Sequence, residues 1–453
     1  MAGWVTIGVA QSSERAPREL QPNTRAMIHY PAYKVAAAHV APVFLDTDRS
    51  VEKACSVIEE AACHGARLIA FPEAFLPGFP VWASLEAPIR THELFKRLAA
   101  SAVEADGPEL ARVRQSAQRH GIFVSIGFTE GTKTSVGCLW NANALIGADG
   151  TILNHHRKLV PTYYEKLIWS NGDGRGLRVC GTELGRIGML IWGENTNPLA
   201  RFALMAEGEQ VHISSYPPVW PTRPPEGRGN YDLTQAIRIR AGSHAFEAKV
   251  FNLVASSCVD HTLRQAIEAA LGREPLRILE QSPAGISLVL DPTGTPVGDA
   301  LCRDEGILYA DIDLAQSVEP KQFHDVVGSY NRFDIFTLTV NRSARLPATF
   351  VDEVHPVVSG QEMSPGQHAH LLSTQNQRIP SGFGAVVPGP PIVSKPAAPA
   401  GIRELDFGTD NGTLFRALGA VFRLLSRGFR KRANPGPPAW SPTSNAMSSE
   451  LSL

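Results

Sequence analysis

The stretch that decides the fold reads GMLIWGENTNPLAR, residues 188–201. Its apolar part, residues 187–192, predicts a buried strand that ends at Gly193, and a helical pattern begins after Pro198. In α/β proteins such a strand-to-helix elbow lies at the carboxyl end of a strand, where ligands bind and nucleophiles are often mounted. We therefore expect the functional site at this elbow, although position 192 carries an indole.

Strands and helices alternate on both sides of the elbow. Asp46 or Asp48 can cap a helix over residues 51–62, and a second helical pattern covers residues 92–120. The strand–helix unit of the elbow itself spans residues 187–206. Apolar runs predict strands at residues 34–40, 67–71, 122–128, 211–215 and 250–256, with a further helix at residues 233–249.

Two hairpins are predicted between these units. The first joins residues 141–146 to 151–155 across an Asp-Gly turn, and the second joins residues 286–290 to 307–312. Because each half of the chain gives strand, helix, strand and hairpin, we expect an α/β protein, a four-layer α-β-β-α sandwich of two sheets with helices outside. A doubly wound open sheet is the alternative, but no Gly-x-Gly-x-x-Gly motif follows a strand, which argues against a dinucleotide-binding unit.

The composition excludes several classes of partner. The 453 residues include 43 basic and 44 acidic side chains, so the charge favours no nucleic acid. No apolar run reaches the roughly 18 residues of a membrane helix, and the N-terminus lacks the basic and apolar regions of a signal peptide. The six cysteines form no CxxC pair, which is typical of reduced thiols. We expect a cytoplasmic protein without nucleic-acid or membrane partners.

The two ends of the chain differ from its middle in amino-acid composition and in the periodicity of apolar residues. Residues 1–32 predict an N-terminal extension, and Met27 is a hypothetical natural start. Residues 33–347 predict one domain, and residues 348–453 a largely disordered tail rich in proline and glycine. Within the tail, residues 413–432 predict an amphipathic helix with a basic face. Docking on this protein or on a neighbouring subunit, binding to a membrane surface, and a solvated helix all remain open.

Glu73 stands at the end of predicted strand 67–71, between Phe71 and Phe75. Burying an ionised carboxylate is costly unless it is paired, and burial raises the pKa of the group. A glutamate in this setting suits a general base or acid near neutral pH. The alternative is a solvated carboxylate at the end of a strand.

A second polar cluster follows the first hairpin. Its first part, residues 155–158, is basic and ends at Lys158, and Glu165 lies one short loop later. Lys158 can pair with a buried carboxylate and place a positive charge where an oxyanion or imine nitrogen develops; a surface basic patch is the alternative. His155 and His156 point to opposite faces of a strand, so they make a poor chelate and no metal site is expected.

The order of Glu73, Lys158 and the elbow resembles that of the nitrilase (carbon–nitrogen hydrolase) family. Three segments are similar to the nitrilase branch: FPEAFLPG at residues 71–78, HRKLVPT at 156–162 and GENTNPLAR at 193–201. The resemblance covers residues 33–347. It implies an α-β-β-α sandwich that forms homodimers and extends into spirals or filaments, with C-terminal tails taking part in assembly.

The resemblance also implies roles for individual residues. Glu73 would be the general base and Lys158 would stabilise the tetrahedral species, while Glu165 matches an additional structural or acid–base glutamate. A cysteine at position 192 would attack an organic nitrile, and water would release a carboxylic acid and ammonia without a cofactor. The backbone N–H of Gly193 would hold developing negative charge.

Substrate contacts are expected from residues around the elbow. They are Gly193, Glu194, Tyr163 and Trp169.

Trp192 stands where the family has its nucleophile. An indole has no basic lone pair and no ionisable proton, and its bulk fills the space that a substrate needs. Ser329 is a second departure, because the family branch commonly has a histidine there. Cys180 and Cys258 are weak substitutes, since buried structural thiols are the default.

Two hypotheses follow. In the first, the chain is a nitrilase inactivated or impaired by Trp192. In the second, it is a non-catalytic nitrilase-fold subunit that binds a small molecule or assembles with active subunits.

Overall fold

The computed structural model describes residues 30–344 of the chain. The proposed start at Met27 and the basic helix at residues 413–432 lie outside these residues. Within residues 30–344, no helix is both long enough and apolar enough to cross a membrane.

The first sheet has six strands in the order β11-β1-β2-β3-β4-β5. Its centre is parallel, because β1 (Ala32–His39), β2 (Ala66–Ala70) and β3 (Phe123–Glu130) run the same way. The antiparallel hairpin of β4 (Trp140–Ile146) and β5 (Ile152–Arg157) completes one edge, and β11 (Gly306–Asp313) pairs antiparallel with β1 at the other. Gly150 takes the positive φ of 81° that the Asp-Gly turn of this hairpin requires.

The second sheet has five strands in the order β10-β9-β8-β7-β6. Strands β7 (Gly185–Ile191), β8 (Val211–Tyr216) and β9 (Phe251–Ser256) are parallel. The short strands β6 (Cys180–Thr182) and β10 (Leu288–Leu290) pair antiparallel at the two edges. The carboxyl end of β7, which carries the elbow, pairs with β8 alone, because β6 pairs only with residues 185–187 at the start of β7.

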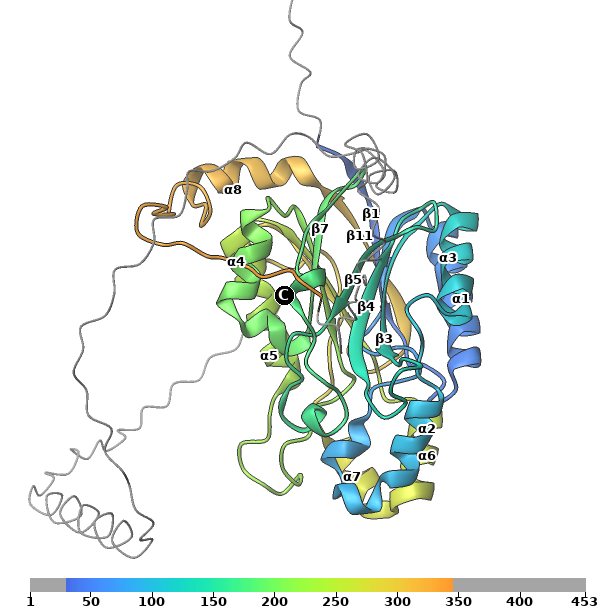
Figure 1. Cartoon of the computed structure of the whole chain (residues 1–453). Coiled ribbons are helices and arrows are strands. Elements are labelled where there is room, and N and C mark those ends of the chain that lie inside the picture. The colour runs from blue at the N-terminus through green and yellow to red at the C-terminus, as the bar shows by residue number, and fades with distance from the viewer. Residues whose placement is uncertain (1–29, 345–453) are drawn as a thin grey trace, which may run out of the picture. The chain divides into compact units, whose positions relative to one another are not determined.

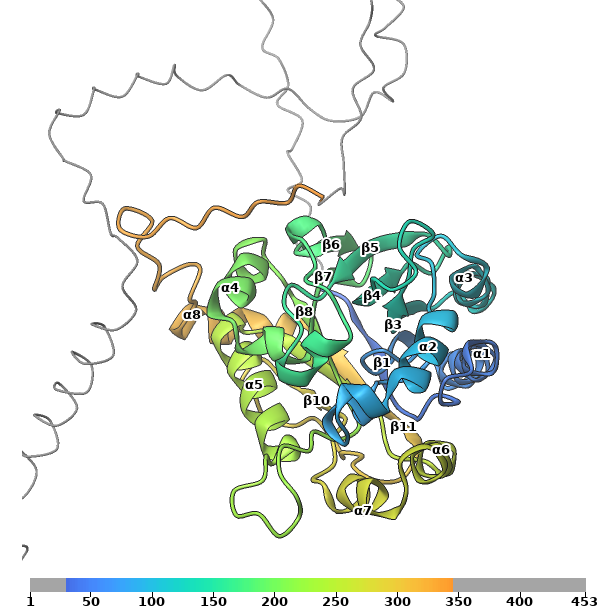
Figure 2. The same ribbon diagram turned by 60° about the horizontal axis from the view of Figure 1, so that its bottom comes forward.

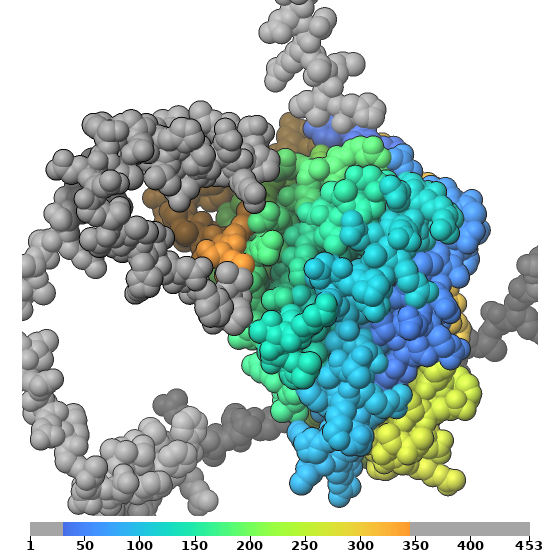
Figure 3. Space-filling view, turned by 45° about the vertical axis from the view of Figure 1, so that its right-hand side comes forward, coloured from blue at the N-terminus to red at the C-terminus, as the bar shows by residue number. Residues whose placement is uncertain are grey.

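Helices cover the outer face of each sheet. Helices α1 (Thr47–Cys63) and α3 (Pro108–His120) lie on the first sheet, and α4 (Pro198–Ala206) and α5 (Leu233–Ala248) on the second (Figures 1 and 2). In the space-filling view, the early part of the chain, coloured blue to cyan, makes up much of the face that is turned to the viewer (Figure 3). The predicted four-layer α-β-β-α sandwich is confirmed.

Apolar side chains fill the space between the sheets. Val35 and Leu68 of the first sheet belong to the same buried cluster as Met189, Ile213 and Leu253 of the second. Burial on both faces explains the continuous apolar run at the end of β7, residues 189–191, whereas β8 is equally buried but carries His212, Ser214 and Ser215. This packing fixes the strand ends from which the functional segments leave.

Helix α1 shows how local sequence sets an element. The Asp46 carboxylate accepts a hydrogen bond from the backbone N–H of Arg49, which caps the helix. Val51, Ala54 and Ile58 on its inner face are fully buried. Asp46, and not Asp48, is the capping residue.

Two predictions about elements are wrong. Residues 92–120 form two helices, α2 (His92–Ala100) and α3, because Pro108 starts a new helix after the turn at Gly107. The second hairpin does not form, because β10 pairs with β9 in one sheet and β11 with β1 in the other. The turn at residues 291–294 instead leads to local bridges beside β10, such as Leu290 with Pro296.

Three helices were not predicted. They are α6 (His261–Leu271), α7 (Arg273–Gln281) and the short α8 (Val318–Phe323).

Candidate active site

Glu73 lies in the tight turn that follows β2, and its side chain is fully buried. The turn packs against Gly127 of β3, where an added Cβ would lie 2.5 Å from the carbonyl oxygen of Pro72. The left-handed φ of 48° at Ala74 turns the chain away behind the carboxylate. Glu73 Oε1 accepts hydrogen bonds from Asn141 Nδ2 and from Lys158 Nζ, each at 2.7 Å.

Lys158 directly follows β5 and joins two carboxylates. Its Nζ lies 2.7 Å from Glu73 Oε1 and 2.6 Å from Glu165 Oε2, and all three side chains are fully buried. The loop at Gly172 holds this segment, since its N–H donates to the Lys158 carbonyl at 2.8 Å. The surface-patch alternative for Lys158 is therefore wrong.

Glu165 lies in the short helical turn Tyr163–Leu167. Its Oε2 also accepts a hydrogen bond of 2.8 Å from the backbone N–H of Thr162, which begins that turn. The same oxygen thus caps a turn and pairs with Lys158.

The electrostatics of this cluster favour proton transfer near neutral pH. Burial raises the pKa of Glu73 to about 8, and the negative charge of Glu165 adds to this rise while Lys158 opposes it. Burial by itself lowers the pKa of Lys158, but the charges of Glu165 and Glu73 outweigh burial and raise it. Among the described residues, Glu73 Oε2 and Glu165 Oε1 have no hydrogen-bond partner, so each carboxylate keeps one oxygen for other chemistry.

The elbow begins where β7 ends, with the turn Trp192–Thr196 leading into α4. Trp192 has a left-handed φ of 45°, which a side-chain-bearing residue adopts only when its surroundings hold it there. Gly193 passes so close to Thr162 that an added Cβ would lie 2.5 Å from the Thr162 hydroxyl oxygen. The elbow therefore packs directly on the segment that carries Lys158 and Glu165.

Glu194 ties the two segments together. Its carboxylate accepts hydrogen bonds from the backbone N–H groups of Ile191 at 2.8 Å and Leu159 at 2.7 Å, and from His156 Nε2 at 2.9 Å. Burial opposes its ionisation, but the charge of His156 and these hydrogen bonds outweigh burial and lower the pKa of Glu194. An ionised carboxylate thus joins the end of β7 to the residue that follows Lys158.

The side chain of Trp192 is buried among other aromatic rings. Its ring centroid lies 5.0 Å from that of Trp220 and 5.6 Å from that of Tyr216, and the Arg240 guanidinium carbon lies 4.8 Å from it. Its indole N–H has no hydrogen-bond partner in the described part of the chain.

A cavity of about 440 Å³ lies on the outer side of this ring. Trp192, Gly193, Glu194 and Tyr163 line it, together with Arg240. Glu73, Lys158 and Glu165 do not line the cavity, whereas the indole of Trp192 does.

The remaining predicted residues take other positions. Trp169 is buried 5.6 Å from the ring of Phe79 and does not line the 440 Å³ cavity. His155 pairs with Glu130 and not with the partner of His156, so the two imidazoles do not converge. Ser329 is exposed in the segment after α8.

The two candidate replacement thiols are poorly placed for catalysis. Burial raises the pKa of Cys258 to about 12, although it borders a small space with Glu73. Burial also raises the pKa of Cys180, which lies on β6 near the Leu153 carbonyl. Both thiols stay protonated at neutral pH, and a protonated thiol is a poor nucleophile.

Asn141 is a functional candidate that sequence reasoning missed. It lies on β4 and donates to the Glu73 carboxylate, beside Lys158. Trp220, Tyr231 and Arg240, which line the cavity, were likewise not predicted. No local pattern marks these residues, because only the pairing of strands and the course of long loops bring them to the site.

Comparisons with known proteins identify the family of this chain. The carbon–nitrogen hydrolase family model matches residues 34–322. A protein named Nitrilase 3, from an unknown prokaryotic organism, is 33% identical over 340 residues, covering 73% of this chain and 96% of that protein. An arylacetonitrilase of Aspergillus kawachii is 32% identical over 326 residues, covering 69% and 93%. A nitrilase of Bacillus sp. strain OxB-1 is 32% identical over 348 residues, covering 76% and 99%.

Solved structures share the fold at lower identity. Saccharomyces cerevisiae Nit3, a member of branch 10 of the nitrilase superfamily, superposes with a TM-score of 0.51 at 18% identity, covering 67% of this chain and 97% of that one. The NitFhit protein of C. elegans gives a TM-score of 0.52 at 18% identity, covering 70% and 69%. Because the family model matches more than half of the sequence and the nitrilase relatives are about one third identical over nearly their whole length, the chain belongs to the carbon–nitrogen hydrolase family, the nitrilase superfamily.

Proposed function

We propose that this chain carries a nitrilase site that has lost its nucleophile. In this account Glu73, Lys158 and Glu165 are the acid–base and electrostatic residues for converting an organic nitrile to a carboxylic acid and ammonia. The observation that carries the proposal is the buried Lys158, which bridges the two carboxylates directly beside the elbow. The nitrilase and arylacetonitrilase relatives support a nitrile as the ancestral substrate.

With a thiol at position 192, the chemistry divides into two steps. Glu73 accepts the thiol proton, the sulfur adds to the nitrile carbon, and the nitrile nitrogen takes up a proton to give a thioimidate. Water then adds to that carbon, ammonia leaves, and a second water releases the carboxylic acid and restores the thiol. Lys158 stabilises the negative charge that develops on the substrate at each addition.

Trp192 blocks this sequence in two ways. An indole provides no sulfur to form the thioimidate, and its bulk fills space at the elbow that a substrate needs. The chain as it stands therefore turns over no nitrile by this route.

A second candidate function is a non-catalytic binding subunit. Its support is the cavity outside Trp192, where Trp220 and Tyr231 offer aromatic faces and Arg240 offers a positive charge. Such a wall suits a small planar ligand. Homodimers that extend into spirals, a cytoplasmic location and the absence of a cofactor remain predictions.

Ammonia release distinguishes the two functions. The unmodified chain and Trp192→Cys are assayed with aliphatic and aryl nitriles, and Trp192→Ser serves as the matched control with a small side chain but no thiol. We expect turnover only from Trp192→Cys. Turnover by the unmodified chain at ordinary rates would overturn the proposal, and a folded but silent Trp192→Cys would favour the binding function.

A further inference from the structure

The elbow is held on its inner side by Asn195. The side-chain nitrogen of Asn195 lies 3.1 Å from the carbonyl oxygen of Trp192 and 3.3 Å from that of Leu190. Only the NH₂ end of the amide can donate to two carbonyls, so the amide orientation is fixed. Its oxygen must then face the other way, toward His212 Nε2 at 2.9 Å and the Ser214 hydroxyl at 3.1 Å.

His212 faces hydrogen-bond acceptors on both ring nitrogens. Its Nε2 meets the Asn195 oxygen, and its Nδ1 lies 2.7 Å from Glu209 Oε1. An amide oxygen and an ionised carboxylate can only accept, so each ring nitrogen carries a hydrogen. The ring is therefore a cation, balanced by the carboxylate of Glu209 beside it.

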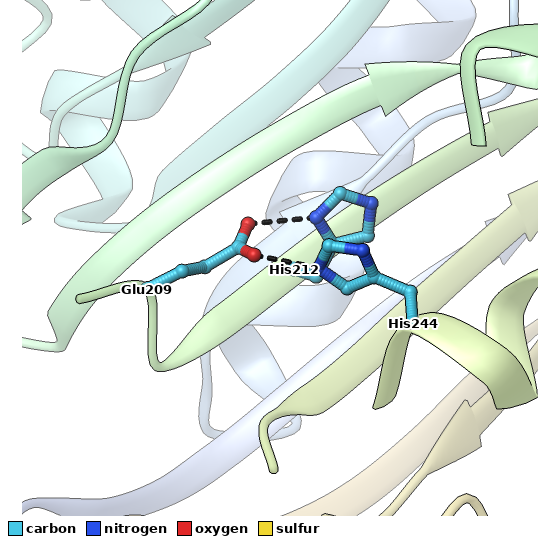
Figure 4. Close-up of side chains that lie close together, drawn as sticks. All are labelled: Glu209, His212 and His244. Atoms are coloured by element: carbon cyan, nitrogen blue, oxygen red, sulfur yellow. Dashed lines mark hydrogen bonds and ion pairs between the residues drawn. The ribbon is translucent and has the colours of Figure 1, made fainter. Parts of the chain in front are cut away.

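Glu209 is shared between two histidines (Figure 4). Its second oxygen lies 2.6 Å from His244 Nε2, and all three side chains are fully buried. Burial opposes ionisation of Glu209, but the charge of His212 and the hydrogen bonds from His212 and His244 outweigh burial and lower the pKa of Glu209 to about 2. Gly188 on the elbow strand leaves the space for this carboxylate, since an added Cβ would collide with it.

The same three residues offer ligand atoms that a metal ion could use. Ligand atoms around a tetrahedral zinc ion stand roughly 3.3 Å apart, with metal–ligand distances of about 2.0–2.2 Å. The observed separations of 2.6 and 2.7 Å are instead those of charge-assisted hydrogen bonds. Hydrogen atoms, and not a metal ion, account for this geometry.

We propose that Glu209, His212 and Asn195 form a positioning relay that holds the backbone of residue 192 in its left-handed conformation. Glu194 holds the elbow from one side through the N–H groups of Ile191 and Leu159, and the relay holds it from the other through the carbonyls of Leu190 and Trp192. The relay sets the direction in which the side chain of residue 192 leaves the strand. The effect of the relay on catalysis rests on the proposed nitrilase function, whereas its hydrogen bonds can be tested independently of that function.

The kinetic test uses Asn195→Asp in the Trp192→Cys chain. Aspartate keeps an acceptor for His212 but replaces the NH₂ group that binds the elbow carbonyls. We expect kcat to fall about 10- to 100-fold, with KM changed less than about twofold, because the nucleophile is displaced while the substrate pocket is kept.

Asn252→Asp is the matched control. Asn252 is a buried asparagine on β9 that accepts a hydrogen bond from Ser214 and donates to the Ala241 carbonyl, without touching the elbow. We expect kcat of this variant to stay within about threefold. Equal losses in kcat for both variants, or a loss confined to KM, would overturn the relay.

A second measurement does not depend on activity. Solid-state NMR of the unmodified full chain labelled with ¹⁵N-histidine separates protonated from unprotonated ring nitrogens, and His212→Gln identifies the signals. We expect two protonated nitrogens for His212 at neutral pH, and one fewer in Glu209→Gln. An unprotonated or zinc-bound nitrogen on His212 would overturn the relay. If Trp192→Cys releases no ammonia, the proposed function fails and this measurement alone decides the relay.

Discussion

The acid–base cluster and the elbow are two adjacent parts of one site, and they differ in what they retain. Around Lys158, two buried carboxylates share one ammonium group and each keeps a free oxygen. At the elbow, the backbone is held on both sides by Glu194 and Asn195, yet the side chain at its apex is a buried indole. In the proposed function, this difference assigns the loss of activity to a single side chain, that of Trp192.

The buried cluster of Glu73, Lys158 and Glu165 is not explained by a contribution to stability alone. Removing charged groups from water costs several kcal/mol per ion, and apolar residues of similar volume often serve a core as well or better. Three ionisable side chains without solvent exposure are typical of a functional site. In the proposed function, this cluster is the acid–base part of a mechanism whose nucleophile is missing.

The largest expected effect comes from breaking the cluster at its centre. Lys158→Met in the Trp192→Cys chain leaves two buried carboxylates facing each other, so we expect about 3–5 kcal/mol lower stability. Turnover should fall about 10²- to 10³-fold because the stabilising charge is gone. Lys133→Met, which removes a lysine that is 88% exposed, is the control and should change neither quantity. Urea unfolding and ammonia release measure the two effects, and an unaffected turnover would contradict the role of Lys158.

Glu73→Gln tests the proposed general base while the positive charge of Lys158 is kept. Glutamine can still accept from Asn141 or Lys158, so the fold should persist while kcat in the Trp192→Cys chain falls about 100-fold. Glu130→Gln, at a buried glutamate that pairs with Arg157 outside the cluster, is the matched control. Comparable activity of the two variants would remove Glu73 from the mechanism.

A smaller effect is expected where the elbow meets the neighbouring segment. Gly193→Ala places a Cβ against the Thr162 hydroxyl, which displaces the elbow from Glu165 and should lower kcat in the Trp192→Cys chain about tenfold. Gly181→Ala is the control, because an added Cβ there meets no atom within 4 Å. Steady-state kinetics of both variants measure this effect. A Gly193→Ala enzyme as active as the control would contradict the claim that the close contact of Gly193 with Thr162 positions the elbow.

The smallest effect concerns stability alone. Burial, with the nearby charge of His212, lowers the pKa of His244 from 6.5 to about 4. The unfolded chain therefore binds more protons than the folded one between these values, and the free energy of unfolding falls as the pH falls through this window. His244→Gln should flatten that dependence by up to about 1 kcal/mol per pH unit. Chemical unfolding at a series of pH values measures it, with the exposed His64→Gln as control, and an unchanged slope would contradict a neutral His244.

Much of the fold could be predicted because its signals are local. The Asp46 cap, the Asp-Gly turn and the apolar run at the end of β7 each mark an element within a few residues. The partner of β11 could not be predicted in this way. It pairs with β1, more than 260 residues earlier in the chain, because that strand offers an open sheet edge.

The functional site likewise contains residues that could be predicted from local sequence and residues that could not. Glu73, Lys158 and Glu165 were predicted from their order and setting, and the structure brings them together. Asn141 and the relay of Glu209, His212 and Asn195 were not predicted, since their contacts depend on how neighbouring strands are placed in register. The conformation of Trp192 likewise could not be predicted, since it depends on a left-handed backbone that no sequence pattern indicates.

If the cluster of Glu73, Lys158 and Glu165 is competent and lacks only a nucleophile, a thiol at position 192 should form a covalent intermediate with a nitrile. Trp192→Cys is mixed with an aryl nitrile, quenched during turnover and examined by intact-mass and peptide mass spectrometry. We predict an adduct at position 192 that is heavier by the mass of the nitrile, because addition of the thiol to the nitrile gives a thioimidate. We also predict ammonia release from Trp192→Cys, and neither adduct nor ammonia from the unmodified chain. A folded Trp192→Cys chain that forms no adduct, or an unmodified chain that releases ammonia, would contradict this prediction.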